Sequence, residues 1–281
     1  MVKLCNMTCF ICNKSTSEKR IGKKITEYCD SCDFHKTKDT QKFSESYEEE
    51  FWINSDYSEF TGTDFTDKKV NDLVLTFESW YSYFKRFLSK KKTILDIGSG
   101  TGVSCILLEK KGYQIIGVDP DKKNSDLINS RLEKGKCINC FFENLEIDEK
   151  VDVIWITHVL EHLPDPTELL VKCKEWLKKD GLICIAVPDC ENPEMLDASV
   201  DNPYHIFHFT KKTLTKIFEK TDFKLIECDS LANLQKTNRR VHKVVKKIGL
   251  NKISESTAPY YPFEITTGNN GYEIRAVLKL N

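Results

Sequence analysis

The chain lacks the segments that would place it in a membrane or direct it out of the cell. No stretch approaches eighteen uncharged apolar residues, and the first fifteen residues lack the apolar core of a signal peptide. An excess of one charge is also missing, because 42 Lys and Arg balance 43 Asp and Glu. Proteins that act on nucleic acid usually carry a basic excess. We therefore expect a cytoplasmic protein with no membrane partner, for which nucleic acid is the less favoured partner.

Cysteine, in contrast, is abundant, with twelve in 281 residues. In a short secreted chain such a number would suggest a disulfide scaffold. Here Cys105, Cys184 and Cys228 lie within apolar segments, where we expect buried free thiols. This usage is typical of a reduced, cytosolic protein.

Two Cys-x-x-Cys motifs near the start, Cys9 with Cys12 and Cys29 with Cys32, are separated by sixteen residues. Each tight turn directs two sulfurs to one point, and four thiolates complete a tetrahedral zinc site with no open position. Redox chemistry is disfavoured because a redox motif of this kind is usually single. We expect a structural zinc module over 1–40, stabilised by the metal because so short a segment buries little core.

A polar and aromatic segment, residues 41–92, follows the zinc module. From Val70 to Leu88 its apolar residues recur at helical spacing. We expect an amphipathic helix that packs on the next domain and a linker that contributes to the acceptor side of a site there.

From residue 93 onward, short apolar strands alternate with helices. Strands are expected over 93–98, 114–119, 137–145, 151–160, 181–189, 223–230 and 271–280, and helices over 102–112, 124–135, 166–181 and 210–223. This alternation predicts an α/β, doubly wound, mainly parallel seven-stranded sheet over 93–281, which binds its ligand at the carboxyl ends of the strands. Thr210 is placed as the N-cap of the last helix.

Residues 231–269 interrupt the alternation and include a basic stretch over 236–252. One interpretation is a lid or a patch that binds a polyanion. The other is a solvated helix face, which is what most charge runs are.

The segment LDIGSGTG follows a predicted strand and opens a predicted helix. Gly98, Gly100 and Gly102 permit a tight turn and the close approach of a ligand. Such loops can hold a pyrophosphate, but Asp96 would repel phosphate and suits a positively charged ligand. Asp119, at the end of the next strand, is placed to accept hydrogen bonds from ribose hydroxyls. The pattern therefore indicates a nucleoside with a cationic tail, such as S-adenosylmethionine.

Over about residues 93–230 the chain resembles the class I S-adenosylmethionine-dependent methyltransferases. LDIGSGTG matches their cofactor loop, GVDP their ribose-binding acid, and THVLEHLPDP the segment after the fourth strand that touches the methionine end. The resemblance implies a Rossmann-like methyltransferase sheet. It also implies a cofactor site made by Asp96, Gly98, Ser99, Gly100, Gly102, Asp119, Pro120, Asn144, Leu145, Thr157 and His158, with Asn144 and Leu145 at the adenine.

The order of the motifs is similar to a bacterial-type group of methyltransferases. A zinc-ribbon-like module, the stretch SYEEEFW, the core and then HIFHFTKKTLTKIFEKTDFKLIE occur in this order in that group. Its members act on sugars, often nucleotide-linked, or on other small metabolites. The resemblance implies a sugar or nucleotide-sugar hydroxyl or carbon as the methyl acceptor. Members usually have a Gly soon after each cysteine pair, where this chain has Asn13-Lys14 and Asp33-Phe34.

Histidines are the natural candidates for a general base, since a hydroxyl acceptor loses its proton as the new bond forms. His205 and His208 lie in DNPYHIFHFT, after the fifth strand of the predicted sheet, where the acceptor is expected. Either is a candidate base, and a packed loop histidine is the alternative. His158 is interpreted as a residue that shapes the cofactor end, and His162 as one that caps the turn or pairs near Glu161.

Three kinds of function remain open on the sequence alone. The favoured one is methyl transfer to a small acceptor. The second is methylation of ribosomal or other RNA, with the zinc module as the RNA reader, because some ribosomal-RNA guanine methyltransferases carry such a module. The third is a non-catalytic binding protein, which the intact Asp96, glycine loop and Asp119 disfavour.

Overall fold

The computed structural model describes residues 8–37, 68–233, 263–266 and 269–281 of the chain. The first half of the predicted linker, most of the predicted insertion over 231–269 and all of the basic stretch over 236–252 lie outside the described residues.

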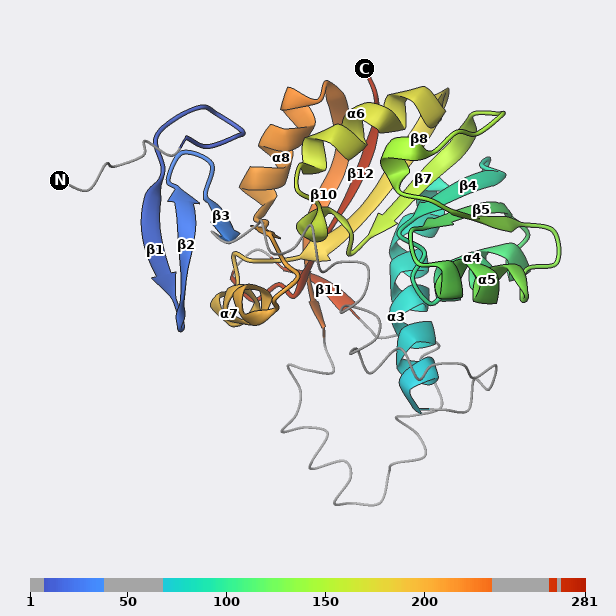
Figure 1. Cartoon of the computed structure of the whole chain (residues 1–281), viewed down its shortest axis with the longest axis horizontal. Helices are drawn as coiled ribbons and strands as arrows, with labels where there is room; N and C mark the ends of the chain where they lie inside the picture. Colours follow the sequence, from blue (N-terminus) through green and yellow to red (C-terminus); the bar gives the residue numbers. More distant parts are fainter. Residues whose placement is uncertain (1–7, 38–67, 234–262, 267–268) are drawn as a thin grey trace.

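The centre of the molecule is a twisted sheet of eight strands in the order β11-β10-β12-β8-β7-β4-β5-β6 (Figure 1). Five neighbouring strands, from β8 to β6 in this order, run parallel, and β12 is antiparallel to both β8 and β10. The strands are β4 (Thr93–Ile97), β5 (Gln114–Asp119), β6 (Lys136–Asn139), β7 (Val151–Thr157), β8 (Leu177–Pro188), β10 (Phe223–Asn233), β11 (Phe263–Thr266) and β12 (Glu273–Leu280).

This topology confirms the predicted doubly wound α/β fold, with one strand more than the seven expected. The additional strand, β11, pairs with the end of β10 and comes from the segment that the sequence indicated as an insertion.

Helices cover both faces of the sheet and build two apolar cores. On one face pack α3 (Lys68–Phe84), α4 (Val103–Lys110) and α5 (Lys122–Asn129); on the other pack α6 (Pro166–Trp176) and α8 (Lys211–Lys220). Alternate residues of β4 enter different cores, Ile94 on the α3 side and Leu95 on the α6 side, as the period of a strand requires. Short 3-10 turns, η1 (Lys85–Phe87), η2 (Phe142–Asn144) and η3 (Leu160–His162), complete this part.

Two helix boundaries test the sequence rules. Thr210 caps α8 as predicted, since its hydroxyl accepts a hydrogen bond from the Thr213 N–H at 3.2 Å. The prediction that α6 continues to residue 181 was wrong. The helix ends at Trp176, because Leu177 is fully buried, extended and paired with Val151 of β7.

A second, smaller sheet has the order β1-β2-β3-β9 and joins the cysteine-rich module to the larger part of the structure. Its first three strands come from the cysteine-rich module: β1 (Ser17–Ile21), β2 (Lys24–Cys29) and β3 (Phe34–Thr37). The fourth, β9 (Phe207–His208), comes from the larger part, between α7 (Pro193–Asp201) and α8. Figure 1 shows the module beside α7 and α8, on the side of the molecule away from α4 and α5.

The module packs against the larger part as well as pairing with it. His35 pairs with His208, and the Thr37 N–H donates to the Ile206 carbonyl at 2.9 Å. Phe10 and Phe34 of the module lie within 5.1 to 5.3 Å, ring centre to ring centre, of each other and of Phe207. The cysteine-rich module therefore shares both a sheet and an apolar core with α6 and α8.

Candidate functional site

The glycine loop lies where the sequence predicts, between the end of β4 and the start of α4. Gly98 and Gly102 have φ angles of 70° and 77°, in the left-handed region that favours glycine. A Cβ atom on Gly98 would lie 2.5 Å from a methyl carbon of Val159, and one on Gly102 would lie 2.3 Å from Ile128. Both positions therefore require glycine for conformation and for space.

Asp96 lies buried beside this loop, with only 1% of its surface exposed. Its carboxylate accepts a hydrogen bond from the Cys105 thiol at 3.3 Å. Burial raises the pKa of Asp96 to about 7. Among the described residues no lysine or arginine forms an ion pair with it, so a cationic ligand would relieve the cost of its burial.

Asp119 closes the loop from the end of β5. One carboxylate oxygen accepts the Gly100 N–H at 2.7 Å, and the other accepts the Asp121 N–H at 3.0 Å. Burial raises the pKa of Asp119 to about 6, although these hydrogen bonds oppose the rise. Ser99 ties the two strands together, since its hydroxyl accepts the Val118 N–H at 3.0 Å and donates to the Asp96 carbonyl at 2.9 Å.

A cavity opens between the glycine loop and α3. It is lined by Leu73, Thr76, Phe77, Trp80, Asp96, Gly98, Ser99, Gly100, Thr101, Val103, Ser104 and Thr157. The sequence predicted that this helix packs on the next domain, within a segment, 41–92, that contributes to the acceptor side. The structure makes the same helix one wall of the cavity.

The other predicted cofactor residues lie outside this lining. Gly102 precedes α4, Asp119 ends β5, Pro120 follows it, and His158 follows Thr157. Asn144 is exposed at the end of η2, whereas Leu145 is buried in the core. Contact of Asn144 and Leu145 with an adenine stays a prediction.

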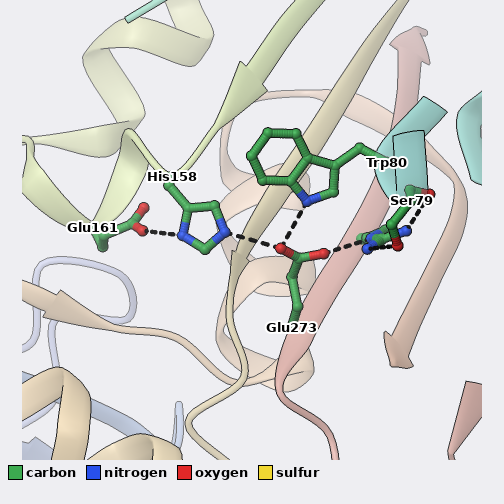
Figure 2. A network of polar contacts seen from close by, with 6 residues as sticks. Ser79, Trp80, His158, Glu161 and Glu273 are labelled. Carbon is green, nitrogen blue, oxygen red and sulfur yellow. Dashed lines mark hydrogen bonds and ion pairs between the residues drawn. The ribbon is translucent and has the colours of Figure 1, made fainter. Parts of the chain in front are cut away.

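His158 is held between two carboxylates (Figure 2). Its Nδ1 lies 3.1 Å from Glu161 Oε1 and its Nε2 lies 2.9 Å from Glu273 Oε1. Burial favours the neutral ring, but the two carboxylates outweigh it and raise the pKa of His158 to about 10. The two carboxylates are stabilised in their ionised form in turn, because His158 helps to lower the pKa of both Glu161 and Glu273 to about 2. His158 is therefore an imidazolium at neutral pH and has no lone pair to act as a base.

The same network reaches α3. Glu273 Oε1 also accepts the Trp80 indole N–H at 2.8 Å, and Arg275 Nε donates to Glu273 Oε2 at 2.5 Å. Arg275 continues to Ser79, with contacts of 2.7 Å to its carbonyl and 2.9 Å to its hydroxyl. The sequence analysis missed Glu273 and Arg275. The signal was an acid and a base two residues apart at the start of a mainly apolar strand, which places both side chains on one face.

The two predicted base candidates have different surroundings. His208 is fully buried, and its ring nitrogens lie 2.9 Å from the Ser199 hydroxyl and 3.1 Å from the Thr37 hydroxyl. Burial lowers the pKa of His208 to about 3 and that of His205 to about 4. His205 lies next to His162, 4.7 Å between ring centres, in a cluster with Glu161. The buried hydrogen bonds of His208 favour a packing role. His205, in contrast, lies in a cluster with Glu161 and His162, next to the segment that follows Thr157.

The four module cysteines meet in one cluster. Cys9 and Cys32 have their sulfurs 3.8 Å apart, and Cys12 and Cys29 have theirs 3.6 Å apart. A tetrahedron with Zn–S bonds of about 2.3 Å places its sulfurs about 3.8 Å apart, so the cluster fits zinc. The Lys216 ammonium of α8 lies 3.7 Å from Cys32 Sγ and would offset thiolate charge.

The residues after the two cysteine pairs explain why this chain does without the usual glycines. Asn13 and Asp33 have φ angles of 57° and 54°. Asn and Asp tolerate this left-handed conformation better than other non-glycine residues do. They therefore make turns whose backbone conformation would otherwise favour glycine.

Comparison with known proteins agrees with this geometry. The family model described as "Methyltransferase domain" matches residues 68–228, which is more than half of the chain. The chain belongs to the methyltransferase domain family. None of the described helices combines the length and the apolar composition needed to cross a bilayer.

Curated relatives of this methyltransferase match only part of it. The ubiquinone biosynthesis O-methyltransferase of Bradyrhizobium diazoefficiens is 31% identical over 99 residues, and the match covers 33% of this chain and 38% of that protein. That of Actinobacillus pleuropneumoniae is 31% identical over 102 residues and 44% of its length is covered. The chain thus spans less than half the length of the curated relatives it matches.

Solved structures share the fold. A possible histamine N-methyltransferase from Thermotoga maritima has a TM-score of 0.53 at 18% identity, covering 73% of this chain and 89% of that one. The 1,6-didemethyltoxoflavin-N1-methyltransferase of Burkholderia thailandensis, solved with 1,6-didemethyltoxoflavin and S-adenosylhomocysteine, has a TM-score of 0.53 at 14% identity, covering 94% and 100%. At such identities the likeness concerns the fold of the methyltransferase domain.

Proposed function

We propose that the protein transfers a methyl group from S-adenosylmethionine to a hydroxyl of a small acceptor. The observation that carries the proposal is the pair of buried carboxylates, Asp96 and Asp119, on either side of a loop that requires glycine. Asp119 would accept the ribose hydroxyls, and Asp96 would balance the ammonium of the methionine part, directly or through water. Neither suits a phosphate.

The remaining cofactor contacts follow from the same placement. Gly98, Ser99, Gly100 and Gly102 would pass close beneath the cofactor. Pro120, Asn144 and Leu145 would lie toward its adenine, and Thr157 and His158 toward its methionine end. Asp96 and Asp119 are buried without an ion-pair partner among the described residues, which favours the binding of a cationic nucleoside.

The transfer itself is an in-line displacement. The acceptor oxygen forms a bond to the methyl carbon while the C–S bond breaks, and the electron pair of that bond stays on sulfur. The acceptor proton leaves as the C–O bond forms. Holding the acceptor in line with the methyl group is therefore the main task of the protein.

The acceptor is proposed to be a sugar or a nucleotide sugar. The motif order resembles sugar-modifying methyltransferases, and the curated relatives carry names that specify transfer to oxygen. The side chains beyond the cofactor cavity are polar: the acid Glu161 and the histidines His158, His162 and His205 lie together there. Such groups suit an acceptor with several hydroxyls.

The zinc module is proposed to be structural and to frame the acceptor side. Cys9, Cys12, Cys29 and Cys32 would hold the ion, which supplies no chemistry beyond fixing their geometry. In this division residues 1–40 are the module, 41–92 the connecting segment and 93–281 the catalytic domain. The connection that supports it is Thr37, whose hydroxyl donates to the His205 carbonyl at 3.0 Å.

Methyl-labelled S-adenosylmethionine tests the proposal. The purified full chain is added to an extract of its host, and the labelled fraction is identified. Label in nucleotide sugars or small glycans, absent with the Asp119→Asn variant, is the expected result. Label in RNA that ribonuclease removes would replace this proposal with an RNA methyltransferase whose zinc module reads the RNA.

A further inference from the structure

Three side chains near the cofactor cavity point their ligand atoms toward one another. Glu161, His162 and His205 each offer one ligand atom, and these atoms all lie within 4.8 Å of one another. Glu161 and His162 belong to η3, and His205 lies between α7 and β9. Among the described residues, nothing donates a hydrogen bond to Glu161 Oε2, although this oxygen is buried. A buried carboxylate oxygen without a donor is costly and points to a cation as its partner.

Hydrogen bonds fix which nitrogen of His162 carries its proton. Its Nδ1 lies 2.9 Å from the Tyr204 carbonyl. A carbonyl only accepts, so Nδ1 is the protonated atom and the lone pair of the neutral ring is on Nε2.

A chain of four groups fixes the proton of His205 in the same way. The Thr37 hydroxyl donates to the His205 carbonyl, so it accepts from Nε2–H of His208 at 3.1 Å. His208 Nδ1 therefore has the lone pair and accepts the Ser199 O–H at 2.9 Å. Ser199 has no second proton, so it accepts Nδ1–H of His205 at 2.8 Å. The lone pair of His205 is left on Nε2.

We propose that Glu161, His162 and His205 bind a divalent transition metal ion. Two neutral imidazoles and one carboxylate are the ligand set of sites that bind Fe²⁺ and similar first-row ions and keep further positions open. Each ligand has the outer hydrogen bond that such sites use to fix orientation: His162 to Tyr204, His205 to Ser199, and Glu161 Oε1 to His158. This site is separate from the four cysteines, whose thiolates leave no position open.

The site would act on the acceptor, and this part rests on the proposed function. His158 touches Glu161 and lies directly after Thr157, which lines the cofactor cavity. Its ring is 5.6 Å from that of Trp80, another lining residue. The ion would therefore bind the acceptor oxygen on the side that faces the methyl group.

A metal-bound hydroxyl loses its proton at lower pH than a free one, because the ion stabilises the alkoxide. The proton passes to solvent, the oxygen attacks the methyl carbon, and the C–S electron pair remains on the sulfur of S-adenosylhomocysteine. In this account His205 is a ligand and not the base.

Manganese is the probe for the test, because four thiolates bind it poorly and its free ion is visible by electron paramagnetic resonance. The zinc-loaded full chain is titrated with Mn²⁺. We expect one bound ion per chain, and at least about tenfold weaker binding in Glu161→Gln and in His205→Ala. Glu194→Gln, an exposed acid on α7, is the matched control and should bind as the unchanged protein does.

Ser199→Ala separates the loss of a ligand from the loss of its support, since it keeps all three ligands and removes the hydroxyl that bonds to Nδ1 of both His205 and His208. It should weaken Mn²⁺ binding about tenfold or more while the zinc content stays the same. Absence of Mn²⁺ binding, or equal binding by the ligand variants and the control, would overturn the metal site. Binding of S-adenosylmethionine is measured in the same samples, so a failure of the metal site is distinct from a failure of the proposed function.

Discussion

Thr37, the last residue of β3, donates its hydroxyl proton to the backbone carbonyl of His205, 168 residues away in the chain, at 3.0 Å. The same hydroxyl lies 3.1 Å from His208. A residue of the cysteine-rich module thus holds the segment that carries His205. The cysteine-rich module is therefore coupled through defined atoms to the segment that is proposed to face the acceptor.

Thr37→Val keeps the shape of this residue and removes the hydroxyl. We expect methyl transfer to fall about tenfold, in line with the loss of a partly buried hydrogen bond worth about 1 to 1.5 kcal/mol, while the affinity for S-adenosylmethionine stays the same. Transfer rates and calorimetric titration of the cofactor measure the two quantities. Equal loss of both would show that Thr37 supports folding in general.

Cys12→Ser tests the zinc site against a matched control, Cys140→Ser. Cys140 belongs to a third Cys-x-x-Cys motif, with Cys137, and lies outside the four-cysteine cluster. We expect zinc content and the midpoint of thermal unfolding to fall in Cys12→Ser alone, because the metal stabilises the module. Metal analysis and calorimetry of both variants check this, and unchanged zinc in Cys12→Ser would refute the assignment.

The charge of Asp96 predicts how cofactor binding depends on pH. Its pKa is raised to about 7 in the free protein, and a cationic ligand binds the ionised form. Binding therefore releases a proton at lower pH, and affinity should fall as the pH drops below 7, by at most about tenfold per unit. Titrations at several pH values measure this dependence. It should flatten in Asp96→Asn, and an equal slope in that variant would contradict the assignment.

The His158 network predicts a stability contribution with a defined pH range. The pKa of His158 is raised from 6.5 to about 10, so its contribution is complete below pH 6.5 and is lost as the pH rises through 10. The pKa values of Glu161 and Glu273 are lowered to about 2, so their contribution is lost as the pH falls below 4.5 toward 2. His158→Gln should reduce the free energy of unfolding by about 2 kcal/mol near pH 6 and by less at pH 9. Denaturant unfolding at both pH values measures the difference, and an equal effect would contradict it.

The sequence contained the local features of this fold. The turn between β4 and α4 was predictable because its three glycines follow a strand pattern, and the cap at Thr210 because a hydroxyl residue precedes a helical period. The cysteine cluster was predictable from spacing alone. Each of these features depends on residues that are close together in the chain.

What the sequence did not indicate depends on contacts between distant residues. β9 is two residues long and exists because it pairs with β3, so no local periodicity marks it. Glu273 meets His158 across 115 positions, and only the placement of β12 beside β8 brings them together. The end of α6 was missed because burial of Leu177 overrides the helical pattern that continues past it.

The central claim is that the glycine loop, with Asp96 and Asp119 beside it, binds S-adenosylmethionine, and calorimetric titration of the full chain tests it most directly. The account predicts one bound cofactor per chain, at least about tenfold weaker binding in Asp119→Asn, and unchanged binding in the control Asp126→Asn, whose carboxylate is exposed in a pair with Lys122. No binding by the unchanged protein, or equal affinity in Asp119→Asn, would contradict it.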